Sequence, residues 1–220
     1  MGHGDLDQLH VREGMPIPRP GSGEVLIRVG ASAVNNTDIN TRVGWYSQSR
    51  SQADAAWSGN PMKFPRIQGA DCCGQITSVG SAIDPARIGE RVLVRTMQEP
   101  INVDGNLIPI TLGSEIDGAF AEYLSVRGSE AFVIDSSLDD AELASFPCSY
   151  STAEELLQRA QVGAERVLII GASGGVGSAA VQLAAMRGAS VVAETTGAHA
   201  DDVKRIGAAD TIDRASDLAD

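Results

Sequence analysis

The 220-residue sequence has few cysteines, few aromatic residues and no excess of positive charge. Its three cysteines, Cys72, Cys73 and Cys148, are too few and too poorly spaced for a disulfide framework or a structural zinc lobe. The formal net charge of −12 disfavours binding to nucleic acid or to an anionic membrane. No apolar run approaches the length that spans a bilayer, and the first ten residues do not have the pattern of a signal peptide. We therefore expect a cytoplasmic protein that binds neither nucleic acid nor membranes.

A glycine turn between an apolar strand and a helix is the most informative feature of the sequence. Residues 166–177 read RVLIIGASGGVG, and Ala172, Gly174 and Gly177 occupy the three small positions of the G-x-G-x-x-G dinucleotide fingerprint. A helix over 176–187 and a second strand over 190–193 complete the unit. The turn predicts a dinucleotide site at the helix N-terminus, made by Ala172, Ser173, Gly174, Gly175, Val176 and Gly177.

The residue pattern before position 135 differs from the pattern after it, and this difference places a domain boundary near that residue. Short β-rich segments separated by glycine and proline suggest a small β-barrel over 1–135; they are 24–34, 74–81, 89–96, 118–126 and 131–135. After Asp135, acidic residues precede apolar residues that are spaced as on one face of a helix, and this pattern marks the change to helices. We therefore expect an α/β protein with a β-rich domain over 1–135 and a nucleotide-binding domain over 136–220.

Four motifs in this order resemble the medium-chain dehydrogenase/reductase superfamily, and in particular its zinc-independent quinone oxidoreductase branch. They are AVNNTDINTRVGWY (33–46), FPRIQGADCCG (64–74), FPCSYSTAEELL (146–157) and GASGGVG (171–177). The resemblance implies a GroES-like β-barrel followed by a Rossmann domain. Only the first half of that Rossmann domain fits into 136–220, so we expect the chain to be part of a longer, homodimeric enzyme. We also expect the isolated chain to self-associate through an open strand edge at 167–170 and to bind NADPH weakly.

The zinc relatives differ from this chain at the metal ligands. Their cysteine, histidine and second cysteine correspond here to Asn35, Ala70 and Cys148, so a single ligand remains and we expect no zinc. The four-cysteine lobe of those relatives would fall within 95–118, which contains no cysteine. The three histidines form no ligand spacing, and we expect His3, His10 and His199 at the surface.

Without a metal, the site would favour an acceptor that spreads negative charge by conjugation: a quinone, an enone or an enoyl thioester. The resemblance implies that Tyr46 lines the substrate pocket as a hydrogen-bond donor and that Asn35 approaches the nicotinamide. The alternatives are that Tyr46 is an aromatic packed beside Trp45 and that Asn35 is a turn residue. We expect Asp38 and Arg42 to brace this loop as an ion pair.

Cofactor choice depends on the end of the second strand. The motif places Thr195, rather than the neighbouring Glu194, at the discriminating position, and this favours NADP(H) over NAD(H). The nearest basic residues, Lys204 and Arg205, lie a helical segment away. The resemblance also places Thr152 near the cofactor ribose, although a Ser-Thr pair before two glutamates is also an ordinary helix start.

These features predict a zinc-independent, NADPH-dependent oxidoreductase of quinones or activated alkenes. Two alternatives are a non-catalytic NADPH-binding redox sensor or structural module, and a zinc-type alcohol dehydrogenase relative that has lost its metal. The loop over 47–64 suggests a lid in which Trp57 covers the acceptor, with a surface insertion as its alternative.

Overall fold

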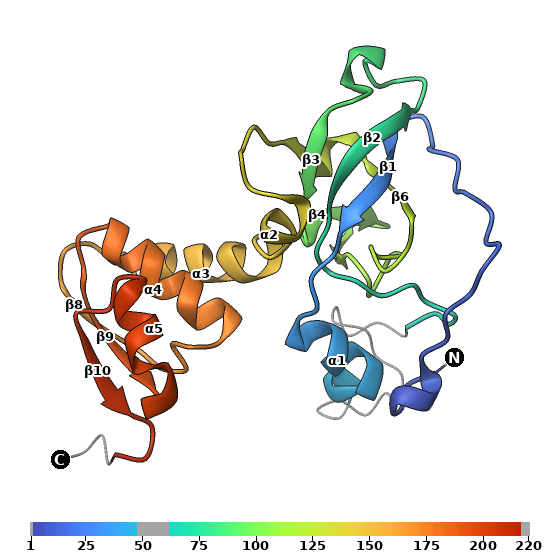
Figure 1. The fold of residues 1–220 in the computed structure, drawn as a ribbon. Coiled ribbons are helices and arrows are strands. Elements are labelled where there is room, and N and C mark those ends of the chain that lie inside the picture. Colours follow the sequence, from blue (N-terminus) through green and yellow to red (C-terminus); the bar gives the residue numbers. More distant parts are fainter. Residues whose placement is uncertain (1, 48–61, 217–220) are drawn as a thin grey trace. The chain divides into compact units, whose positions relative to one another are not determined.

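The structure is a computed structural model that describes residues 2–47 and 62–216. The chain divides into two compact units, Met1–Cys148 and Ser149–Asp220 (Figure 1). Trp57, the residue expected in a lid, lies outside the described residues. None of the described helices is long and apolar enough to cross a membrane.

The first unit is built on a five-stranded antiparallel sheet in the order β6-β1-β2-β3-β7. The strands are β1 (Glu24–Ala31), β2 (Cys73–Val79), β3 (Arg91–Val94), β6 (Tyr123–Arg127) and β7 (Ala131–Val133). Val25 and Ile27 of β1 are fully buried and pack with Ile76, Val92 and Leu124 in one core. The predicted β-rich unit is therefore confirmed.

Two elements of this unit are not in the sequence-based prediction. The first is a β-hairpin made by β4 (Met97–Val103) and β5 (Asn106–Thr111). Pro100 and Pro109 interrupt the alternation of apolar and polar residues by which these strands could have been predicted. The second is the helix α1 (Asn36–Val43), which is too polar to show an apolar stripe. Its start does carry a local signal for a helix N-terminus, because Asn35 and Asp38 form a capping box.

Short helices complete the first unit and lead into the second. They are η1 (Leu6–Gln8), η2 (Trp45–Ser47), η3 (Pro85–Arg87), η4 (Gly128–Glu130), α2 (Asp140–Ala144) and α3 (Pro147–Arg159). The helix α2 is tied to the sheet by Arg91 of β3. Its guanidinium donates to the Asp140 carboxylate at 2.7 Å and to the carbonyls of Ser136 and Leu138.

The second unit contains a three-stranded parallel sheet in the order β10-β9-β8. Its elements are β8 (Arg166–Ile169), α4 (Gly175–Met186), β9 (Ser190–Thr195), η5 (Gly197–His199), α5 (Ala200–Arg205) and β10 (Asp210–Asp213). Ala179 and Val181 of α4 pack on Ile169 and Val191 of the sheet, and all four are buried. The predicted parallel α/β segment is confirmed. Among the described strands β8 is an edge, and Leu168 is 46% exposed.

Candidate functional site

A buried carboxylate joins two of the positions that correspond to zinc ligands in relatives. Asp71, just before β2, has no exposed surface, and its Oδ2 accepts a 2.7 Å hydrogen bond from the Asn35 side-chain nitrogen. Its Oδ1 accepts from the backbone N–H of Cys148, also at 2.7 Å, whereas the Thr96 hydroxyl, 3.4 Å away, donates to the Ala70 carbonyl at 2.9 Å. The fold therefore brings Asn35 and Cys148 to opposite oxygens of one side chain.

A second buried carboxylate holds the same corner of the unit. Asp38, in the first turn of α1, accepts from the backbone N–H of Asn35 at 2.8 Å and from those of Gly69 and Ala70 at 3.2 and 3.1 Å. It braces the loop, as expected, but through backbone donors. The expected ion pair with Arg42 is not among those of the described residues, and Arg42 instead donates to the Gly4 carbonyl.

Tyr46 lies in η2 and folds back onto the first turn of α1. Its hydroxyl and that of Thr37 are 2.9 Å apart, and either can be the donor. The Tyr46 ring also packs edge to face against Trp45, with ring centroids 5.3 Å apart. The aromatic contact and the polar contact are thus both present. Asn35 caps the helix turn that carries Thr37, so the structure places both predicted catalytic residues at one helix end.

Burial dominates the titration of this region. It raises the pKa of Asp71 to about 6, with a smaller contribution from the neighbouring charge of Asp38, and it also raises the pKa of Asp38. Burial, aided by the charges of Asp71 and Asp38, raises the pKa of the Cys148 thiol to about 12. This raised pKa keeps the Cys148 thiol protonated at neutral pH, which makes it a poor nucleophile.

The donor set at the zinc-ligand positions does not suit a zinc ion. Ala70 has no side-chain ligand atom and the Asn35 nitrogen donates to Asp71, so Cys148 is the single side-chain ligand among the three positions. Within residues 2–47 and 62–216, no group of three or more histidine, cysteine or acidic side chains is placed to hold a metal.

One histidine is less exposed than the sequence analysis expects. His3 is half-buried: its Nδ1 lies 2.8 Å from the Thr41 carbonyl oxygen, and its ring meets Phe64 edge to face. The contact follows from the main-chain pairing of Gly4 with Arg42, which docks the N-terminal segment on α1. His10 and His199 are exposed, as expected.

The glycine turn of the second unit forms a cradle of backbone groups at the start of α4. Ser173, Gly174 and Gly175 are exposed while Ala172 is fully buried, and the helix begins with Gly174 as its N-cap. A Cβ atom on Gly177 would lie 2.2 Å from the Gly171 carbonyl oxygen, so only glycine fits there. The first-turn N–H groups of this twelve-residue helix face outward beside the exposed turn, which suits a pyrophosphate.

Three residues lie together at the carboxyl end of β9. Glu194 is buried, and its Oε2 accepts from the Gly171 backbone N–H at 2.8 Å, so this carboxylate braces the turn. Thr195 is 3% exposed, and its hydroxyl has no hydrogen-bond partner among the described residues. Arg214, which follows β10, donates its backbone N–H to the Thr195 carbonyl at 2.8 Å. Its guanidinium is 78% exposed and 4.0 Å from Glu194.

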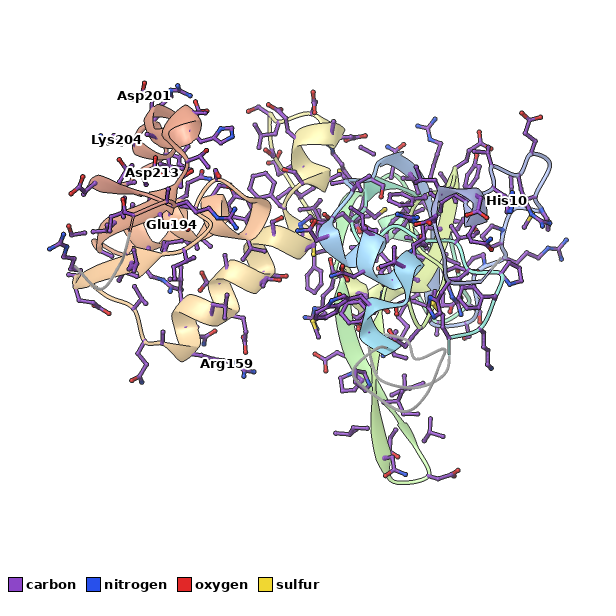
Figure 2. The ribbon with its side chains drawn as sticks, turned by 90° about the horizontal axis from the view of Figure 1, so that it is seen from below. His10, Arg159, Glu194, Asp201, Lys204 and Asp213 are labelled. Atoms are coloured by element: carbon purple, nitrogen blue, oxygen red, sulfur yellow. The ribbon has the colours of Figure 1, made fainter. Side chains whose placement is uncertain are left out.

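Arg214 is a candidate site residue that sequence reasoning missed. Parallel pairing of β9 with β10 sets Thr195 opposite Asp213. Arg214 therefore lies beside Thr195, although the two residues belong to different segments of the sequence. Figure 2 shows Glu194 and Asp213 on neighbouring strand ends, and Lys204 on α5. Thr152 is exposed on α3, in the turn after Ser149, whose hydroxyl lies close to Gly175.

Comparisons with known proteins agree with this architecture. Residues 21–136 match the family model of the alcohol dehydrogenase GroES-like domain. A crystal structure of a candidate alcohol dehydrogenase from Sinorhizobium meliloti superposes with a TM-score of 0.89 at 41% identity, over 99% of this chain and 62% of that one. The predicted fold, a GroES-like β domain followed by a partial Rossmann segment, is confirmed.

The curated relatives fall into two functional groups. The NADPH-dependent alkenal/one oxidoreductase of Arabidopsis thaliana is 29% identical over 88% of this chain and 45% of its own length. An NAD-dependent alcohol dehydrogenase of Sulfurisphaera tokodaii is 30% identical over 82% of this chain and 53% of its own. The chain spans about half the length of these relatives. It is about equally similar to both, so these identities do not assign it to either functional group.

Proposed function

Because the chain belongs to the alcohol dehydrogenase GroES-like family of medium-chain dehydrogenases/reductases, we propose that its protein is a nicotinamide-dependent oxidoreductase. Its proposed reaction is zinc-independent hydride transfer from NADPH to a quinone or an activated alkene. The observation that carries this choice is the cluster around Asp71. At the three positions that correspond to zinc ligands in relatives, this chain has an asparagine that donates to Asp71, an alanine and a single cysteine.

The acceptor would be activated by hydrogen bonding rather than by a metal. Tyr46 is the proposed donor to the acceptor oxygen, a role in which Thr37 donates to the Tyr46 oxygen and leaves the phenol proton for the substrate. A conjugated acceptor needs no metal ion to activate it. The negative charge that hydride transfer brings spreads through the conjugated system to an oxygen, and one hydrogen-bond donor can stabilise that oxygen. Asn35 completes the proposed catalytic pair.

The second unit provides the proposed cofactor site. The backbone of the exposed residues Ser173, Gly174 and Gly175 and of the half-buried residues Val176 and Gly177 would hold the pyrophosphate, with Ala172 packed beneath it. The exposed guanidinium of Arg214, whose backbone pairs with Thr195, favours a ribose 2′-phosphate over a bare 2′-hydroxyl. Glu194 does not compete for the ribose, because the Gly171 N–H engages its carboxylate. Thr152 is the proposed ribose contact from α3.

Turnover assays combined with metal analysis test the proposal. We expect the purified protein to oxidise NADPH with quinones, enones or enoyl thioesters, and to contain no stoichiometric zinc. Zinc at one ion per chain, together with oxidation of simple alcohols, would place the protein among the zinc-dependent alcohol dehydrogenases. Tight NADPH binding without turnover on any conjugated acceptor, unaffected by Tyr46→Phe or Asn35→Ala, would instead identify a non-catalytic module.

A further inference from the structure

The hairpin of β4 and β5 projects from the five-stranded sheet of the first unit (Figure 2). Its base is anchored by three buried residues, Gln98, Ile110 and Thr111. Among the described strands β4 and β5 pair only with each other, and Leu107 near the turn is 67% exposed. A two-stranded ribbon is marginally stable in water on its own, so an exposed apolar ribbon indicates a surface that packs against a partner.

One face of the hairpin carries a hollow with an aliphatic residue at its edge. Strand pairing sets Met97 opposite Thr111, and residues 107, 109 and 111 of β5 point to the same side because side chains alternate along a strand. Met97, Leu107 and Pro109 therefore share one face, and together with Pro100 they line a hollow of about 410 Å³. This face thus offers both a projecting leucine and a space that a second leucine can enter.

The charges on this face balance each other. Arg95 and Glu99 both line the hollow, and the Arg95 Nη1 lies 2.9 Å from the Glu99 Oε1. Between residues 100 and 110 the sequence has a single charged residue, Asp104 in the turn. The chain as a whole has a net charge of −12. On this neutral face, two copies can therefore meet without bringing like charges together.

Pairing through the edges of the hairpin is disfavoured by its prolines. Pro100 lies in β4 and Pro109 in β5, so each strand lacks one backbone donor. Proline in an edge strand is a common protection against pairing with another chain. The turn at Asp104 and Gly105, with φ of 52° and 85°, has the tight two-residue form and closes the end of the ribbon. These features favour contact through the face of the hairpin.

We propose that two copies of this chain associate through this face, in a twofold contact whose residues all belong to the first unit. Leu107 of each copy enters the hollow of the other copy. Arg95 of each copy lies opposite Glu99 of the other, because a twofold axis pairs the same two positions twice. The contact is small, so the dimer is weak and depends on protein concentration. The structure thus points to a different surface from the strand edge at 167–170 that the sequence suggests.

Sedimentation velocity over a range of protein concentrations tests the proposal. We expect the wild-type protein to self-associate reversibly. Leu107→Glu should raise the dissociation constant of the dimer at least about 30-fold, because each dimer then buries the introduced charge twice. Leu6→Glu, at a similarly exposed leucine of η1, is the matched control and should keep the wild-type dissociation constant. Leu107→Ala replaces Leu107→Glu if that variant does not fold.

A second pair of variants tests the charges. Glu99→Lys should weaken the dimer about fivefold, since a lysine there faces Arg95 of the other copy. Glu155→Lys is the matched control, because it changes the net charge by the same amount and also breaks an i,i+4 ion pair, the one with Arg159. We expect Glu155→Lys not to weaken the dimer.

Several results would overturn the proposal. A protein that stays monomeric at every concentration is one, and a folded Leu107→Glu variant with the wild-type dissociation constant is another. Association that is lost in Leu168→Glu but kept in Leu107→Glu would place the contact at the edge of β8 instead. Equal effects of Glu99→Lys and Glu155→Lys would overturn the pairing of Arg95 with Glu99. Circular dichroism and thermal unfolding report the folding of each variant.

Discussion

The two candidate sites are built from different materials. In the second unit the cradle at residues 171–177 is made of backbone groups, and its shape depends on small residues close together in the sequence. In the first unit the cluster is centred on the Asp71 side chain, and its hydrogen-bond donors, the Asn35 amide and the Cys148 backbone N–H, lie 36 and 77 positions away in the sequence. An added Cβ atom disrupts a site whose backbone groups are closely packed, whereas the loss or reversal of a hydrogen-bonding group disrupts a site made by a side chain. Mutations therefore affect the two sites by different mechanisms.

The largest expected effect is on chemistry in the first unit. We expect Tyr46→Phe to lower kcat about 100-fold with little change in NADPH affinity, because the ring remains and only the donor to the acceptor oxygen is lost. Steady-state kinetics with the same quinone for both proteins measure the change in kcat. Tyr123→Phe on β6 is the matched control. Equal losses in kcat and NADPH affinity would show that Tyr46 supports the fold rather than the reaction.

The backbone site is tested by adding one methyl group. We expect Gly177→Ala to weaken NADPH binding about 30-fold, or by about 2 kcal/mol, because the new Cβ overlaps the Gly171 carbonyl oxygen and pushes the turn outward. Fluorescence titration with NADPH measures the change. Gly163→Ala, outside the turn, is the control, since its Cβ would meet only the flexible end of the Glu165 side chain at 3.3 Å. Wild-type affinity in Gly177→Ala would contradict the close-packing account.

Arg214 tests whether the second unit also uses a side chain. We expect Arg214→Gln to weaken NADPH binding about fivefold and to leave NADH binding unchanged, because an exposed guanidinium contributes about 1 kcal/mol to a phosphate contact. Competition binding with the two dinucleotides measures the ratio. Arg205→Gln, on α5 and paired with Asp202, should have no such selective effect. Equal weakening of both dinucleotides would remove Arg214 from the 2′-phosphate site.

The smallest expected effect is a pH dependence confined to the side-chain site. Burial raises the pKa of Asp71 from 3.8 in the unfolded chain to about 6, so the folded state favours the protonated carboxyl. Stability from this group is therefore greatest below pH 3.8 and is lost as the pH rises through 6. Between about pH 5 and pH 8 we expect the wild-type protein to lose about 1 kcal/mol of unfolding free energy relative to Asp71→Asn. Denaturant unfolding of both proteins across this range measures it, and parallel curves would contradict the shift.

The sequence alone determined the features that depend on neighbouring residues. The strand, glycine turn and helix at 166–187 were readable because buried strands, tight turns and helix starts each have local rules. The β-branched runs located the five strands of the main sheet in the first unit, although not the ends of those strands. In 118–126 the strand begins only at Tyr123, because Gly118 and Phe120 hydrogen-bond to the loop at 67–68 instead.

What only the tertiary structure decided are the contacts between distant residues. The central place of Asp71, the pairing of Tyr46 with Thr37 and the position of Arg214 beside Thr195 follow from how strands and helix ends are packed. The expected Asp38–Arg42 ion pair was wrong for the same reason, since buried backbone N–H groups of the 69–70 loop needed an acceptor and Asp38 supplied it. Local sequence specifies the conformation of a segment, but the partner of a buried polar group is set by whichever donors the fold brings within about 3 Å of it.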